Sequence, residues 1–128
     1  MQQFEPGIHH IEFWVANLEE SICFYSRLFS IIGWKQLNES AFSTGEIEIY
    51  FKEVEEKIVR TLGPRHICYQ AVSRTVVNEV ANFLQNVQVE IIRGPIETNH
   101  YSDGYYTVDF YDPNGFVVEV AYTPNVEM

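Results

Sequence analysis

Basic residues are scarce in this sequence. Its 128 residues include eight Lys and Arg against eighteen Asp and Glu, so the formal net charge is −10. A surplus of negative charge of this size repels phosphate backbones and anionic lipid headgroups. The composition therefore argues against nucleic acid and membrane surfaces as partners.

Cysteine and long apolar runs are also scarce. The two cysteines, Cys23 and Cys68, and the lack of a basic-then-apolar leader after MQQFEPG predict a cytoplasmic protein without disulfide bonds. The longest apolar-rich stretch, LFSIIGW, is much too short to cross a bilayer. Hydrophobic residues still make up 46% of the chain, which is enough for one compact core. We expect a single domain over residues 1–128.

The first half of the chain carries the patterns of one strand, one helix and three further strands. GIHHIEFWV, residues 7–15, alternates apolar and polar residues as a strand does. NLEESICFYSRLF has one apolar helical face, formed by Leu18, Ile22, Tyr25 and Phe29. Asn17 is placed to cap this helix, and Gly33 suits its exit. Residues 33–54 then break into three short strand patterns, the last of which is EIEIYFKEV.

The second half repeats this order at a constant offset. GPRHICYQAVSRTVVNEVA aligns with GIHHIEFWVANLEESICFY 56 residues earlier, so that His66 meets His10. Three strand patterns follow, VQVEIIRG, GYYTVDFY and GFVVEVAYT, and the turn DPNG joins the last two. We therefore predict an α+β fold of two βαβββ modules, at about residues 7–54 and 63–123, joined by the charged segment EEKIVRTLGPRH.

Strand parity places two histidines and one acid on the same side of their sheets. Successive side chains of a strand point to opposite faces, so Ile11 and its apolar neighbours pack under the helix while His10 faces away from it. The same reasoning turns His66 and Glu119 toward the open face, since Glu119 lies between two core valines.

A carboxylate among valines needs a partner, because an isolated buried charge is costly to desolvate. Two neutral imidazoles and one carboxylate are a common ligand set for divalent Zn, Ni, Mn or Fe. Each residue alone also fits an ordinary hydrogen-bonded or solvated strand position. Their shared parity and the internal repeat favour a metal site at His10, His66 and Glu119.

The motifs H-H-I-x-F-x-V-x-x-L-x-x-S-x-x-F-Y at residues 9–25 and D-P-N-G-x-x-x-E-V at residues 112–120 resemble those of the vicinal oxygen chelate superfamily. This superfamily includes glyoxalase I, fosfomycin-resistance proteins, extradiol dioxygenases and bleomycin-resistance proteins. The resemblance implies two βαβββ modules whose sheets form a cupped half-barrel, with the helices outside, around a divalent metal ion. It also implies that His10, His66 and Glu119 are the metal ligands and that His9 is not.

A fourth position is offered by Glu48. Glyoxalase I enzymes, which the chain resembles, carry an acid at the end of the first module as well. Parity supports this position, because Ile49 and Phe51 would cover the helix side and turn Glu48 toward the open face. The first module lacks a DPNG turn, so its register stays open: Glu48 is a catalytic base, a ligand, or a solvated strand residue.

Four aromatic residues are candidates for the substrate pocket or, equally, for the core: Trp14, Tyr50, Tyr101 and Tyr106. The resemblance implies a glyoxalase-like lyase or isomerase, in which the metal acts as a Lewis acid on vicinal oxygens of a small substrate. Its alternatives are an extradiol-type dioxygenase and a non-catalytic small-molecule-binding protein of the bleomycin-resistance kind. The resemblance further implies a homodimer, because such proteins often pair modules across chains.

Overall fold

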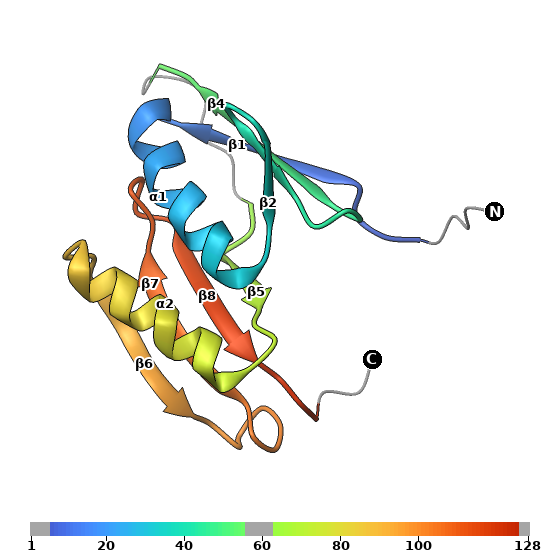
Figure 1. Ribbon diagram of the computed structural model, residues 1–128, viewed down its shortest axis with the longest axis vertical. Coiled ribbons are helices and arrows are strands. Elements are labelled where there is room, and N and C mark those ends of the chain that lie inside the picture. The colour runs from blue at the N-terminus through green and yellow to red at the C-terminus, as the bar shows by residue number, and fades with distance from the viewer. Residues whose placement is uncertain (1–5, 56–62, 126–128) are drawn as a thin grey trace.

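The computed structural model describes residues 6–55 and 63–125 (Figure 1). Most of the predicted connecting segment EEKIVRTLGPRH lies outside the described residues. Module one consists of β1 (His10–Val15), α1 (Leu18–Ile32), β2 (Lys35–Asn38), β3 (Ala41–Ser43) and β4 (Glu48–Glu53). Module two consists of β5 (His66–Gln70), α2 (Arg74–Asn86), β6 (Ile91–Glu97), β7 (Tyr106–Tyr111) and β8 (Val117–Tyr122).

Each module forms its own four-stranded mixed sheet. The strand orders are β1-β4-β3-β2 and β5-β8-β7-β6, and the first two strands of each order run parallel. The crossover helix of each module lies between its two parallel strands in sequence, as a βαβ connection requires. The predicted α+β fold of two βαβββ modules is confirmed.

A side-chain cap begins each helix, at Asn17 as predicted and at Ser73 in module two. The Asn17 side chain accepts a hydrogen bond from the backbone N–H of Glu20 at 3.0 Å, and that of Ser73 accepts one from Val76 at 3.3 Å. Gly33 ends α1 with a φ of 100°, a left-handed conformation that glycine adopts without strain. Asn17 and Ser73, which occupy corresponding positions in the two modules, therefore cap their helices in the same way.

The strand predicted at residues 87–94 begins later than expected. Val87 and Val89 still donate backbone hydrogen bonds to Phe83 and Leu84, so they form the turn that follows α2. Their side chains pack against the core, which explains why their alternation resembled a strand. The strand β6 begins at Ile91.

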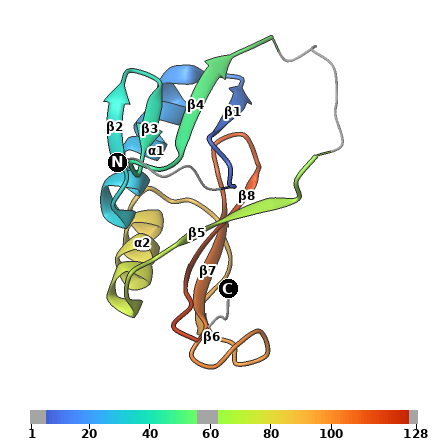
Figure 2. The ribbon, with the colours of Figure 1, turned by 90° about the vertical axis from the view of Figure 1, so that its right-hand side faces the viewer.

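One hydrophobic core holds both modules together. Both helices lie on the same side of the molecule, and Figure 2 views it from the side of the strands. The Phe29 ring of α1 lies 5.3 Å from that of Tyr69 on β5, and Phe24 lies 5.5 Å from Phe83 on α2. Each of these aromatic pairs adds to the stability that burial provides.

The turn DPNG fastens module two onto α1. The Asp112 carboxylate accepts a hydrogen bond from the Tyr25 hydroxyl at 2.7 Å, in the buried core. The Asn114 side chain accepts one from the backbone of Ala16 at 3.1 Å and donates one to Ser21. The packing of the two modules within one chain is therefore specified by polar contacts as well as by apolar burial.

Candidate metal centre

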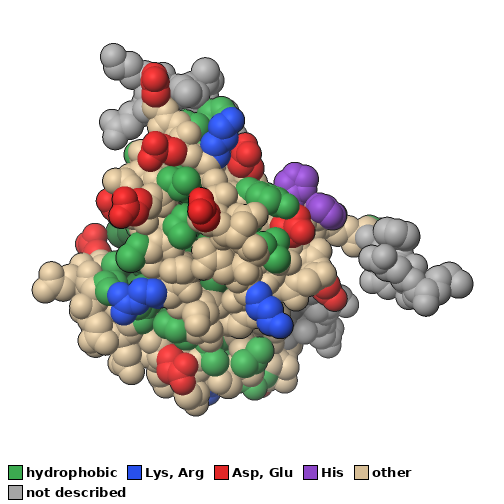
Figure 3. All heavy atoms as spheres, turned by 45° about the horizontal axis from the view of Figure 1, so that its top comes forward, with side chains coloured by type: hydrophobic (Ala, Val, Ile, Leu, Met, Phe, Trp, Pro, Cys, Tyr) green, Lys and Arg blue, Asp and Glu red, His purple; other side chains and the backbone are tan. Residues whose placement is uncertain are grey.

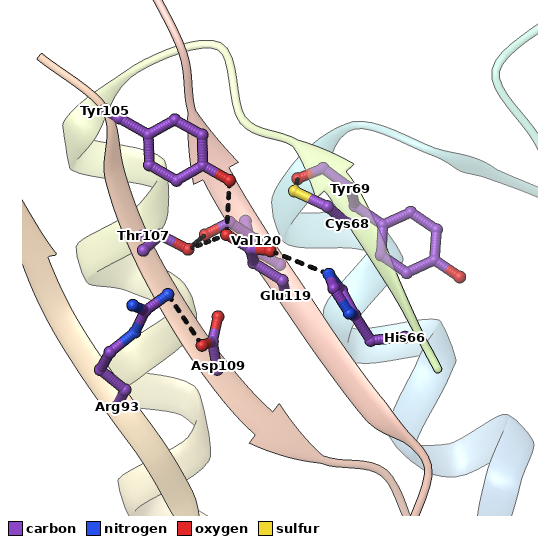
Figure 4. Close-up of polar contacts among 9 residues, drawn as sticks. All are labelled: His66, Cys68, Tyr69, Arg93, Tyr105, Thr107, Asp109, Glu119 and Val120. Atoms are coloured by element: carbon purple, nitrogen blue, oxygen red, sulfur yellow. Dashed lines mark hydrogen bonds and ion pairs between the residues drawn. The ribbon is translucent and has the colours of Figure 1, made fainter. Parts of the chain in front are cut away.

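The histidine and the acid of module two lie side by side on its open sheet face. We call His66 and Glu119 the module-two pair. His66 Nε2 lies 3.4 Å from Glu119 Oε1 across the parallel strands β5 and β8 (Figure 4). Glu119 is nearly buried, at 7% exposure, whereas the His66 side chain is 46% exposed. The pair therefore joins a fixed carboxylate to an accessible imidazole.

Two hydroxyl groups hold the other oxygen of this carboxylate. Glu119 Oε2 accepts hydrogen bonds from the Tyr105 hydroxyl at 2.6 Å and from Thr107 Oγ1 at 2.7 Å. These two hydrogen bonds fix the orientation of the carboxylate. Burial and the hydrogen bond to Glu119 raise the pKa of Tyr105, so its hydroxyl keeps its proton. Oε1 remains available toward His66.

The donor set of the module-two pair fits a divalent ion. Imidazole nitrogen and carboxylate oxygen each lie at about 2.0–2.2 Å from zinc, so two such ligands of one ion are roughly 3.0–3.5 Å apart. The observed separation of 3.4 Å lies within this range. Hydrogen bonds to the second carboxylate oxygen are the usual outer support of such ligands.

Two further residues of this site were not foreseen from the sequence. Arg93 on β6, Asp109 on β7 and Glu119 on β8 are direct cross-strand neighbours. Arg93 Nη2 lies 3.0 Å from Asp109 Oδ2. Burial and the nearby Glu119 carboxylate raise the pKa of Asp109, and Arg93 offsets part of this rise. The alternation around Val108 and Phe110 could have identified Tyr105, Thr107 and Asp109 as residues of the open face.

A cavity of about 580 Å³ opens beside the module-two pair. This volume is within the usual range for small-molecule sites. The cavity lining combines the module-two pair with cationic, acidic, aromatic and aliphatic side chains: Arg65, His66, Ile92, Arg93, Tyr101, Tyr105, Asp109, Val117 and Glu119.

The histidine and the acid of module one are also neighbours. We call His10 and Glu48 the module-one pair, since they are register partners on the parallel strands β1 and β4. Glu48 accepts a hydrogen bond from the Tyr50 hydroxyl, and this bond raises the pKa of Tyr50. His10 Nδ1 is 2.9 Å from His9 Nδ1, and the Tyr50 ring is 5.7 Å from that of His10.

The expected convergence of His10, His66 and Glu119 does not occur within one chain. Among residues 6–55 and 63–125, no three His, Cys, Asp or Glu side chains are close enough to hold a metal ion. The physical reason is the packing of the modules. They meet through their helices and the DPNG turn, and in the described part of the chain no strand of one sheet pairs with a strand of the other. Each module thus presents a separate pair.

The four aromatic pocket candidates have different positions. Tyr101 lines the cavity, and Tyr50 lies beside His10 on the open face. Trp14 is 52% exposed on the open face of β1 and donates a hydrogen bond to Glu12. The expected place of Tyr106 in the substrate pocket is wrong, because its hydroxyl donates a hydrogen bond to Asn78 of α2 at 2.6 Å, on the helix side of the sheet. Its neighbour Tyr105 faces the cavity instead.

The two paired βαβββ modules, each with a histidine and an acid on its open face, define the class of fold to which the chain belongs. The sequence profile of the Glyoxalase/Bleomycin resistance protein/Dioxygenase superfamily matches residues 7–120, and the chain belongs to this superfamily.

Several proteins resemble the chain over almost its full length. The virulence protein STM3117 of Salmonella typhimurium is 25% identical, covering 94% of this chain and 87% of the relative. A provisionally named glyoxalase of Bacillus halodurans is 26% identical, with a TM-score of 0.74 and coverage of 90% of this chain and 94% of that structure. A glyoxalase/dioxygenase of Nostoc punctiforme shares the fold at 18% identity, with a TM-score of 0.71 and coverage of 98% and 99%. Within the described residues no helix is long and apolar enough to cross a membrane.

Proposed function

We propose that the protein is a divalent-metal-dependent, glyoxalase-like lyase or isomerase that acts on a small substrate with vicinal oxygens. The observation that carries this proposal is the module-two pair. The Glu119 carboxylate is oriented by two hydroxyl donors and lies 3.4 Å from the His66 imidazole, beside a cavity of ligand size.

The complete centre is proposed to form between two copies of the chain. The module-two pair of one copy and His10 of a second copy would together supply the three expected ligands. This arrangement follows from the separation of the two pairs within one chain and from the open sheet face that each pair occupies. Closed, symmetric dimers are the commonest way to pair such faces.

The residues of the centre have separate roles in this proposal. A bound divalent ion would supply Lewis-acid polarisation of the substrate oxygens. His66 and Glu119 would hold the ion, while Tyr105 and Thr107 keep the carboxylate oriented. Glu48, half-buried on the open face, is the proposed base for a carbon-bound proton, and Tyr50 fixes its orientation by donating a hydrogen bond.

A second candidate function is oxygen activation. The proposed centre has two histidines and one carboxylate, the set found in many non-haem Fe(II) oxygenases. The presence of Tyr50 at the module-one position that corresponds to Glu119 favours this alternative, because a tyrosine lies where a fourth ligand, a second carboxylate, would be expected. Specific retention of Fe(II) and oxygen consumption with a catechol would support it over lyase chemistry.

The dimeric centre can be tested by mixing two variants. Each homodimer of His10→Ala or His66→Ala lacks one ligand in both centres. A mixed dimer contains one centre with both histidines intact, provided that each centre takes its two histidines from different chains. We expect metal content after co-refolding to return to about one ion per mixed dimer. No recovery, with mixed dimers verified by mass, would contradict a shared centre, and a 14.9 kDa species alone in sedimentation would contradict the dimer.

A further inference from the structure

We infer that the cavity beside the module-two pair binds a carboxylate group of the substrate, and that Arg93 is the residue that recognises it. This inference rests on the proposed function and narrows its substrate class. The substrate would be a small carboxylic acid that carries vicinal oxygens at some distance from its carboxylate.

The position of Arg93 is unusual for so acidic a chain. Only eight Lys and Arg are present, and the face in Figure 3 shows many Asp and Glu side chains with isolated Lys and Arg. Two of the eight cations, Arg65 and Arg93, nevertheless line the cavity that contains His66 and Glu119. A cation placed in a ligand-sized cavity next to a candidate metal ligand is suited to a substrate anion.

The backbone of β6 brings Arg93 into this position. Gly94 follows it with a φ of 93°, and a Cβ at Gly94 would collide with the backbone oxygen of Thr107. The register between β6 and β7 shifts at the same place. Only glycine allows this close approach, which holds β6 against the strand that carries Thr107 and Asp109.

The Arg93 guanidinium is oriented but retains free donors. One nitrogen, Nη2, pairs with Asp109 at 3.0 Å, while Nε is buried and has no hydrogen-bond partner among the described residues. A guanidinium has five N–H donors in a planar fork, a geometry that matches a carboxylate. The side chain is 37% exposed, so part of the fork faces the cavity.

The charges around Arg93 favour a carboxylate over a phosphate. Asp109 and Glu119 occupy the same row of the sheet, so an incoming anion meets two carboxylates as well as the guanidinium. A monoanion suffers less repulsion there than a dianion does. Arg93 and Glu119 are two strands apart, roughly 10 Å between backbones, which leaves room for the carbon chain of a small acid.

Binding of matched probes tests this assignment. The probes are 3,4-dihydroxybutanoate, its neutral amide, and glycerol 1-phosphate, titrated by NMR into the purified protein, whose metal content has been measured. We expect the acid to bind at least about tenfold more tightly than the amide, as a charged hydrogen-bonded pair provides. The phosphate should bind more weakly than the acid.

A double variant removes both members of the ion pair between Arg93 and Asp109. Arg93→Gln combined with Asp109→Asn leaves no unpaired buried carboxylate, so the fold is expected to survive, and the preference for the acid should disappear. Arg74→Gln is the matched control, because Arg74 pairs with Glu97 at 2.9 Å outside the cavity, and it should retain the preference.

Equal affinity of the wild type for acid and amide, or a preference that persists in the double variant, would overturn the inference. Tighter binding of the phosphate would overturn the choice of carboxylate. Metal measurement keeps the two proposals separate. If the protein holds no metal but still prefers the acid through Arg93, only the proposal of a metal centre is refuted. If it holds metal but lacks that preference, only the assignment of Arg93 is refuted.

Discussion

The two modules have the same order of elements, but they place their acids differently relative to their histidines. In module two, His66 is the register partner of Val117, and Glu119 is that of Cys68. In module one, His10 is the register partner of Glu48, and Glu12 is that of Tyr50. Because Cys68 follows Glu12 by the same 56 residues that separate the histidines, Tyr50 and not Glu48 corresponds to Glu119.

The surroundings of the two acids differ as well. Glu119 is nearly buried and accepts hydrogen bonds from two hydroxyl groups, whereas the half-buried Glu48 accepts one from Tyr50. A buried, multiply bonded carboxylate is suited to hold an ion in fixed geometry. Glu48 is more accessible and lies two residues before the position that corresponds to Glu119, so it is suited to exchange a proton. Similar sequence modules thus place their acids at different register positions and in different surroundings.

The largest expected effect is on metal affinity, which should depend on Glu119 much more than on Glu48. Glu119→Gln should lower the metal affinity by more than about a hundredfold, because it removes a charged ligand. Glu48→Gln should change that affinity little. Titration of the chelator-stripped protein with Zn²⁺ or Ni²⁺ measures both. An equal loss in the two variants would show that both acids are ligands and that the modules do not differ in this respect.

The same Glu48→Gln variant should lose turnover. Removal of a positioned general base is expected to lower kcat by roughly a hundredfold, with metal content and stability unchanged. The measurement needs a substrate found by screening compounds with vicinal oxygens. Full activity with metal bound would reduce Glu48 to a solvated strand residue, and another group would then have to act as the base.

The support of Glu119 can be weakened without touching a proposed ligand. Thr107→Val keeps the shape of the side chain and removes one donor to Oε2, so the metal affinity should fall by about tenfold. Ser43→Ala in module one is the matched control, because its hydroxyl donates to a backbone oxygen of Ile47. Unchanged affinity in the Thr107 variant would mean that the hydroxyl does not orient the carboxylate.

Removal of metal should destabilise the wild type. Ligands that bind the folded state raise its stability by mass action, so a chelator should lower the Tm by several degrees. His66→Ala should be insensitive to the chelator. A wild type that carries metal but has the same Tm in chelator would contradict a specific tight centre.

The smallest effect concerns the DPNG turn, which only module two has. Tyr25→Phe removes the buried hydrogen bond to Asp112 and should lower the free energy of unfolding by about 1–2 kcal/mol. Tyr106→Phe, which removes an exposed hydrogen bond to Asn78, should cost less. Urea denaturation measures both. An equal loss in the free energy of unfolding in the two variants would show that the hydrogen bond between Tyr25 and the DPNG turn adds no more stability than an exposed one.

Much of the fold followed from local patterns. Asn17 and Ser73 cap their helices, and the alternation of β1 and β5 turns His10 and His66 away from the core. Both depend only on neighbours within a few residues. Tyr106 was misplaced, although it shares the parity of the buried Val108 and Phe110, and that alternation puts it on the helix side.

The sequence by itself determined the order of the elements, the faces of their strands and the family, because period, caps and motif spacing are local properties of the chain. Tertiary structure alone decided the strand register that pairs His10 with Glu48, the row of Arg93, Asp109 and Glu119, and the separation of the two pairs within one chain. These depend on contacts between residues far apart in sequence. Such contacts are selected by the packing of a common core, and no short stretch of sequence encodes them.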